Sequence, residues 1–171
     1  MSAAQVVFAY FAGAMTILSL LVVTRRNPVH SVLWMLVLFI HIAALYLFLN
    51  AEFIAAIQII IYAGAILVLF LFVIMLLNLR KEETEKRFQK QWLYGIAISG
   101  VLVIFLVSVV GNITVGPPPG PYTAEAIKSE GHLMTVGKVL YSEFLLPFEI
   151  ASLILLVAII GAVVLAKKRL E

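Results

Sequence analysis

The sequence predicts an all-α, polytopic membrane protein with five transmembrane helices. Three observations lead to this prediction: 64% of the 171 residues are hydrophobic, only 12% are charged, and the hydrophobic residues form long apolar runs. A soluble globule of this size could not cover its surface with so few polar side chains. We expect residues 1–171 to form a single transmembrane domain.

Each apolar run is close to the ~20 residues that a membrane-spanning helix needs. Two connections are very short. The first, around Arg25 and Asn27, is followed by Pro28, which is well tolerated in the first turn of a helix because that position has no hydrogen bond to lose. The second consists of Asn50 and Ala51 alone. The predicted spans are residues 3–24, 29–49, 52–79, 92–113 and 143–166.

Two longer connections differ in composition. Residues 80–91 carry charges of both signs, with Glu82 and Glu83 about four residues before Lys86 and Arg87, a spacing that favours a short solvated helix. Residues 115–140 begin with a polyproline stretch, which is stiff and extended. We expect this second connection to be a spacer on the protein surface.

Lysine and arginine predict the orientation of the chain. Ten of the 12 lie in the turn at 25–26, in segment 80–91 and in the tail 167–169, and the other two lie in residues 115–140. The positive-inside rule then places the amino terminus outside and the carboxyl terminus in the cytoplasm, or on the equivalent matrix side. We expect a multi-pass protein of the inner, cytoplasmic membrane, surrounded by the lipid bilayer.

Several classes of function are excluded by the residues that the chain contains. Its net charge of +3 is spread over short basic clusters between apolar runs, which is typical of orientation signals and not of nucleic-acid binding. The absence of cysteine excludes iron–sulfur clusters and disulfides within the chain. No glycine-rich phosphate loop is present. Residues 1–5 lack the basic start of a signal peptide, so we expect the first apolar run to be retained as a span.

The third apolar run contains the main candidate site. Gln58 and Tyr62 are four residues apart and would share one face of a regular helix. Burial of these polar side chains against partner helices would cost less free energy than exposure to lipid. The small residues Ala63, Gly64 and Ala65 follow at once, and glycine weakens a helix. The polar face and the weakest turn of this span therefore coincide.

Ionisable residues near the spans are further candidates, because charge inside a membrane is costly. Glu52 begins the third run, where it either stabilises the helix N-terminus or handles protons. Glu149 follows Pro147 in the last run and is a candidate buried carboxylate. His41 is alone in the second run, and we expect it to be packed and hydrogen-bonded, since a haem would need a second axial ligand at the same depth.

Three stretches carry a resemblance to a known family. The run from Gln58 to Met75, with its Q-x-x-x-Y-x-G-A core, resembles the third helix of the J subunit of proton-pumping NADH:quinone oxidoreductase, respiratory complex I, whose mitochondrial counterpart is NADH dehydrogenase subunit 6. Residues 27–31, Asn-Pro-Val-His-Ser, are similar to the family's first turn, and residues 137–162 to its last helix. The family often has a second tyrosine near position 144, where this chain has Phe144.

The resemblance implies a non-redox subunit of the membrane arm, near the quinone-site module. FMN, iron–sulfur clusters, NADH and quinone would be bound by partner subunits, and the expected partners are membrane-arm subunits of the A, H, K and N types. It also implies that the third helix switches between a regular α-helix and one with a π-bulge near Tyr62 and Gly64. That switch would join or break a water path to neighbouring carboxylates.

Two other functions stay open on the residues alone. A purely structural assembly subunit would need the same apolar helices and small-residue faces. A small secondary transporter would need internal repeats and a second interrupted span, and neither is evident in the sequence.

Overall fold

The computed structural model describes residues 2–77, 92–112, 120 and 122–167. In this part of the chain all regular structure is helical. Five helical segments are long and apolar enough to cross a membrane, which confirms the predicted fold class. They are Ala3–Thr24, Pro28–Phe48, Glu52–Leu76, Trp92–Gly111 and Leu145–Ala166.

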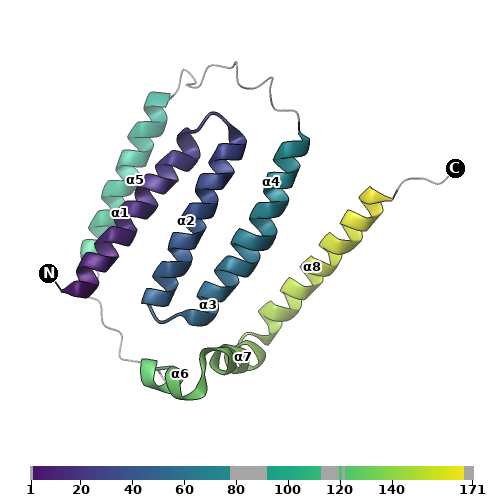
Figure 1. Cartoon of the computed structure of the whole chain (residues 1–171). Helices are drawn as coiled ribbons and strands as arrows, with labels where there is room; N and C mark the ends of the chain where they lie inside the picture. The colour runs from purple at the N-terminus through teal and green to yellow at the C-terminus, as the bar shows by residue number, and fades with distance from the viewer. Residues whose placement is uncertain (1, 78–91, 113–119, 121, 168–171) are drawn as a thin grey trace. The chain divides into compact units, whose positions relative to one another are not determined.

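The chain divides into two compact units, Met1–Pro118 and Pro119–Glu171. The first unit contains α1 (Ala3–Thr24), α2 (Pro28–Phe48), α3 (Glu52–Ile57), η1 (Gln58–Ile66), α4 (Leu67–Leu76) and α5 (Trp92–Asn112). The second contains α6 (Ala124–Glu130), α7 (His132–Ser142) and α8 (Leu145–Ala166), and Figure 1 labels the helices of both units. The single transmembrane domain expected from the sequence stays a prediction.

The helix bounds lie close to the predicted spans. The first span has the predicted bounds, the second begins and ends one residue earlier than predicted, and the last begins two residues later. The third ends at Leu76, and the predicted residues 78 and 79 lie outside the described part of the chain. Segment 80–91, predicted as a short solvated helix, also lies outside it.

A tight turn joins α1 to α2, which pack against each other. The Asn27 side chain caps α2 by accepting a hydrogen bond of 2.9 Å from the Val29 N–H, and Pro28 occupies the first helical position. The Ser31 hydroxyl donates a hydrogen bond to the Val22 carbonyl across the turn. Two side chains, those of Asn27 and Ser31, therefore stabilise the turn that the sequence predicts.

The turn between α2 and α3 is a Schellman motif. Asn50 takes a left-handed conformation with φ 57°, which asparagine tolerates better than most residues. The Ala51 N–H donates to the Tyr46 carbonyl at 2.8 Å, and the Asn50 N–H donates to the Leu47 carbonyl at 3.0 Å. These bonds satisfy carbonyls that the end of α2 would otherwise leave free. The chain can then reverse direction within two residues.

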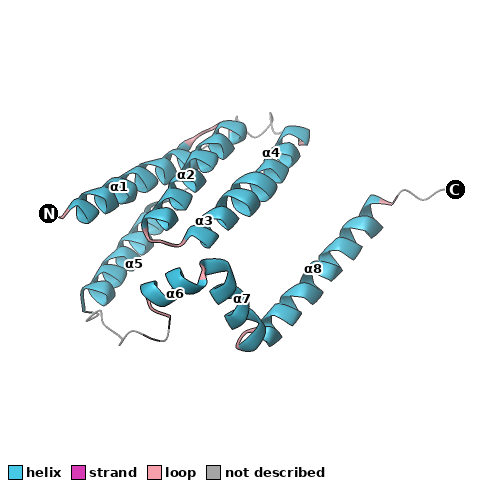
Figure 2. Ribbon diagram, turned by 60° about the horizontal axis from the view of Figure 1, so that its bottom comes forward, coloured by secondary structure: helices cyan, strands magenta, loops and turns pink. Residues whose placement is uncertain are grey.

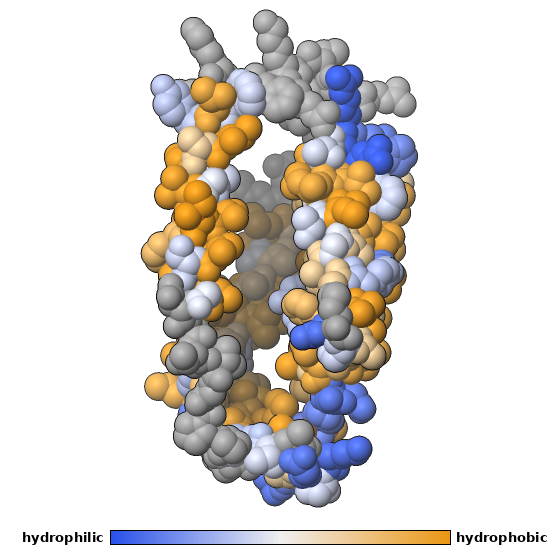
Figure 3. All heavy atoms as spheres, turned by 90° about the vertical axis from the view of Figure 1, so that its left-hand side faces the viewer, coloured by the Kyte–Doolittle hydropathy of each residue, from blue (hydrophilic) through white to orange (hydrophobic). Residues whose placement is uncertain are grey.

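Most apolar side chains are exposed within this one chain. In the described residues of α5 and α8 no side chain is buried. Figure 3 shows hydrophobic side chains along the helices, with hydrophilic ones nearer the ends. Such surfaces require lipid or partner helices around them. The buried apolar residues of the described chain all lie in α1, α2 and the third span: Leu18, Val32, Ala43, Ala55, Ala63 and Leu67.

The second unit contains two helices where the sequence suggested a spacer. Residues 124–130 and 132–142 are α6 and α7, which the sequence analysis did not predict, and the expectation of a surface spacer stays a prediction. The Thr123 side chain caps α6 by accepting a hydrogen bond of 3.2 Å from the Ala126 N–H. Gly131 separates the two helices with φ 89°, a conformation that favours glycine. Neither helix is long enough to form a span, so neither was visible as an apolar run.

Candidate functional site

The third span is interrupted by a π-helix of nine residues, η1, which covers Gln58–Ile66 between α3 and α4. A π-helix pairs backbone groups five residues apart, and the Leu67 N–H accordingly donates to the Tyr62 carbonyl. The candidate π-bulge is therefore confirmed, and it starts a full turn before Tyr62. Figure 1 shows α3 and α4 as one continuous rod beside α2.

Gly64 fits the wider π turn because it has no side chain. A Cβ atom built on Gly64 would lie 3.2 Å from the Ile59 carbonyl oxygen, five residues earlier in the chain. Ordinary van der Waals contacts of a Cβ atom begin at about 3.4 Å, so any side chain would press on this carbonyl. A residue larger than glycine at position 64 would therefore require this carbonyl to shift by a few tenths of an ångström.

The buried stripe of η1 follows the π repeat. Gln58 and Ala63 are only 7% and 6% exposed, and they are five residues apart. Tyr62, which a regular helix would place on the face of Gln58, is 47% exposed, and Gly64 and Ala65 are exposed as well. The predicted site residues are thus adjacent, but only Gln58 and Ala63 are buried within this chain.

Tyr62 contacts α2 through its ring. The ring centroids of Tyr62 and Phe39 are 6.0 Å apart at an interplanar angle of 78°, which is an edge-to-face contact. Sequence analysis did not single out Phe39, because it is one of 11 phenylalanines and lies in a uniformly apolar run. The contact joins the π-helix to a regular helix that it packs against.

The two candidate carboxylates lie apart from η1 in the chain and are exposed. Glu52 is in the first turn of α3, where its charge is favourable for the helix dipole. Glu149 is in α8, and its backbone carbonyl accepts a hydrogen bond of 2.7 Å from the Ser152 hydroxyl. Burial of either carboxylate would have to come from surroundings outside this chain, so their proposed role stays a prediction.

His41 is packed as expected. Its Nδ1 lies 2.8 Å from the Val37 carbonyl oxygen, a hydrogen-bonding distance within α2. The rings of Tyr10 and Phe11 of α1 lie 6.3 Å and 6.5 Å from its imidazole, measured between centroids. Within the described residues no three histidine, aspartate or glutamate side chains gather in a way that could hold a metal ion.

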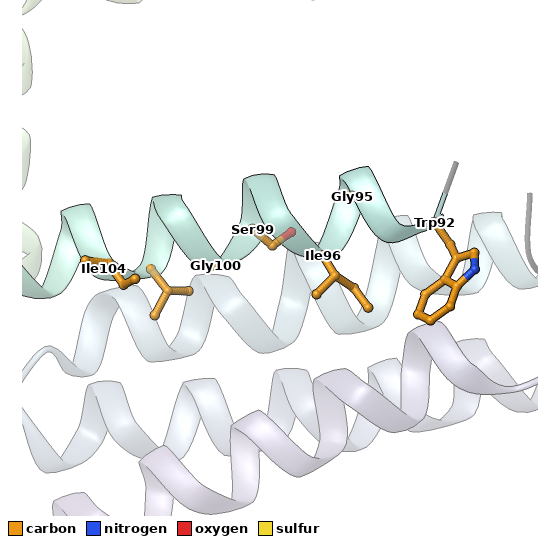
Figure 4. A pocket seen from close by; sticks show the side chains of 7 residues that line it. Trp92, Gly95, Ile96, Ser99, Gly100 and Ile104 are labelled. Atoms are coloured by element: carbon orange, nitrogen blue, oxygen red, sulfur yellow. The ribbon is translucent and has the colours of Figure 1, made fainter. Parts of the chain in front are cut away.

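A shallow apolar groove follows one face of α5. Figure 4 shows its side chains along that single helix, with small residues between larger ones. Small residues let another helix approach closely in a membrane. The groove therefore has the composition of a helix-packing face. Its lining residues are Trp92, Gly95, Ile96, Ser99, Gly100, Val103 and Ile104.

The residues of η1 offer few reactive groups, so a role of this site would depend on a change in its backbone conformation. Its nine residues include one ionisable side chain, the phenol of Tyr62, and one amide, that of Gln58. Conversion of the π turn to a regular α turn would rotate the following residues by about 100°, because each α-helical residue turns by that angle. Such a conversion would change which side chains of α4 face its neighbours.

Comparison with known proteins identifies similar chains. A family model for NADH-ubiquinone/plastoquinone oxidoreductase chain 6 matches residues 18–165. The NADH-quinone oxidoreductase subunit J of Rickettsia felis is 38% identical over 169 residues, which cover 96% of this chain and 80% of the relative. The NAD(P)H-quinone oxidoreductase chain 6 of Leptolyngbya boryana is 39% identical over 161 residues, covering 94% and 78%. That of Synechocystis sp. is 36% identical over 153 residues, covering 87% and 73%.

Proposed function

The chain belongs to the NADH-ubiquinone/plastoquinone oxidoreductase chain 6 family, and from this membership we propose that it couples quinone reduction to proton transfer through η1. It is a multi-pass membrane subunit of NADH-quinone oxidoreductase, and other subunits of that complex are its partners. The proposal concerns how this subunit contributes.

The close approach of position 64 to the Ile59 carbonyl is the observation that carries the proposal. A side chain at position 64 would press on this carbonyl in the π form, so we expect a bulky residue there to disfavour that form. Elements with two discrete arrangements are what conformational coupling between sites requires. π-Helical turns also occur frequently at functional sites.

The switch would change the orientation of side chains in α4. Rotation by about 100° after η1 changes the direction of the following side chains, including Val68, Leu69 and Phe72. These three are exposed in this chain and are thus available to neighbouring subunits. A change of this kind wets or dries a path between partner carboxylates. Glu52, in the unit that contains η1, is one carboxylate that this chain itself can offer to such a path.

The remaining roles in the reaction belong to the partners in this proposal. FMN, iron–sulfur clusters, NADH and quinone are bound by other subunits, and this chain is a non-redox subunit without a catalytic centre. The expected partners are membrane-arm subunits of the A, H, K and N types. The amino terminus lies outside and the carboxyl terminus in the cytoplasm, with the chain in the inner membrane.

A purely structural role in assembly is the second candidate. It is favoured by the absence of buried side chains among the described residues of α5 and α8, which need other chains or lipid around them. A structural role requires the packing surfaces but no second conformation of η1. The two functions therefore differ in what a change at Gly64 does.

Gly64→Val in the assembled complex separates the two functions. The β-branched side chain disfavours the π turn, so quinone-linked NADH oxidation and proton pumping should both slow, while NADH oxidation by an artificial electron acceptor stays intact. Gly13→Val is the matched control, since a Cβ on this α1 glycine meets nothing within 4 Å. Normal pumping by a fully assembled Gly64→Val complex would leave only the structural role.

A further inference from the structure

Helix α7 has an apolar face that is turned outward. With about 100° between successive residues, Leu133, Val136, Gly137 and Leu140 lie within one third of the helix circumference. Thr135, Lys138 and Ser142 lie on the opposite side. Leu133 and Val136 are 68% and 42% exposed, and the flanking Met134 and Tyr141 are 58% and 63% exposed. In a soluble protein, large apolar side chains such as Leu133 and Met134 would more often be covered.

Two polar residues of α7, Thr135 and Lys138, contact the end of α6 within the same unit. Thr135 is buried, and its hydroxyl lies 3.4 Å from one carboxylate oxygen of Glu130, the last residue of α6. The Lys138 ammonium forms an ion pair with the other oxygen of the same carboxylate. Glu130 thus holds the polar side of α7 against the end of α6.

The position of α7 along the chain places it at a membrane surface. Only Glu143 and Phe144 separate it from α8, which is long and apolar enough to span the membrane. The ring of Tyr141 contacts that of Phe148, with centroids 5.3 Å apart, so the last turn of α7 packs on the beginning of the span. Figure 2 shows the sharp turn from α7 into α8. With 11 residues, α7 extends about 16 Å and is too short to cross.

We infer that α7 is an interfacial helix whose apolar face, centred on Leu133 and Val136, inserts into the boundary between phospholipid headgroups and acyl chains. Amphipathic helices bind this boundary through buried apolar area, and exposed tyrosines such as Tyr141 are common there. The only lysine of α7 is already paired with Glu130. Insertion therefore depends on apolar contact and not on lipid charge.

Spin labels can test this position, because the chain contains no cysteine of its own. Leu133→Cys and Val136→Cys place a nitroxide on the apolar face, and Ser129→Cys and Ser142→Cys place one on α6 and on the polar face as matched controls. The complex is reconstituted into vesicles of phosphatidylcholine with or without phosphatidylglycerol. A complex that contains the unchanged chain is labelled in the same way, and its signal, which comes from cysteines of other subunits, is subtracted from that of each variant. Collisions with oxygen, which is enriched in lipid, are compared with collisions with a water-soluble nickel chelate.

The inference predicts that labels at 133 and 136 shift toward oxygen and away from nickel relative to 129 and 142, equally in both lipid mixtures. Greater access to nickel than to oxygen at 133 and 136 would mean that the face is in water, which overturns the inference. Protection from both reagents would mean that a partner subunit covers the face, which overturns it as well. The readout does not depend on turnover, so it is separate from the test of η1.

Discussion

The rings of Phe39 in α2 and Tyr62 in η1 meet edge to face, with centroids 6.0 Å apart and planes at 78°. This contact joins a regular helix to the middle of a π-helix. Because a π-to-α conversion would shift the register of the residues that follow, the ring pair would favour the π form in which it is observed.

Removal of either ring should weaken the same interaction. In a double-mutant cycle with Phe39→Ala and Tyr62→Ala, the free energies of unfolding in detergent should show a coupling of about 0.5–1.5 kcal/mol, as edge-to-face pairs do. Tyr62→Phe is the matched control, since it keeps the ring and removes the hydroxyl. Additive effects of the two alanine substitutions would show that the rings do not interact.

The turn between α1 and α2 should depend on its cap. Asn27→Ala removes the acceptor for the Val29 N–H and should lower the free energy of unfolding by about 1 kcal/mol. Asn27→Asp retains an acceptor and should be close to the unchanged chain. Thermal or denaturant unfolding followed by circular dichroism measures the difference, and equal stability of the alanine and aspartate variants would contradict the capping role.

The orientation of the chain can be tested by labelling. Single cysteines at Ser2 and Ser129 should react with an impermeant thiol reagent added outside, whereas cysteines at Glu85 and Glu171 should react only after the membrane is opened. This expectation rests on the distribution of lysine and arginine. Labelling of position 85 from outside would overturn it.

The contact between α6 and α7 should weaken in acid. The hydrogen bond from Lys138 keeps the pKa of the Glu130 carboxyl below its ordinary value of 4.5. A group with a lowered folded-state pKa stabilises the fold above its unfolded-state value, and that contribution is lost as the pH falls through the folded-state value. Hydrogen exchange of the α7 amides, corrected for intrinsic rates, should therefore lose protection below about pH 4.5.

Glu130→Gln provides the control for this pH dependence. The amide cannot titrate, so the loss of protection in acid should be much smaller in this variant, and protection at neutral pH should already be reduced. The same acid-induced loss in both chains would assign the effect to another group.

Much of the fold could be predicted because long apolar runs have one stable solution in a membrane. The five spans follow from run length, and a weak turn in the third span follows from the polar and small residues around Tyr62 and Gly64. The π form of that turn was implied by the family resemblance. Helices α6 and α7 could not be predicted this way, since their stability depends on local contacts such as the one between Thr135 and Glu130.

The sequence analysis named the candidate residues of η1 but could not predict their contacts. The pairing of Gln58 with Tyr62 assumed a regular helix, whereas the π repeat buries Gln58 together with Ala63. Phe39 carries no distinguishing signal in its run. The surroundings of Glu149 lie beyond this chain, because the described side chains of α8 are exposed along its length.

A distance measurement across η1 tests the central claim most directly. One spin label is placed at Phe72 in α4 and the other at Leu33 in α2, both at exposed positions, and pulsed dipolar spectroscopy is applied to the complex at rest and during turnover with NADH and quinone. If η1 converts between π and α forms, position 72 rotates by about 100° and two distances should appear, with proportions that change on turnover. Gly64→Val should leave only one of them. A single distance under all conditions, unchanged by that substitution, would contradict the claim.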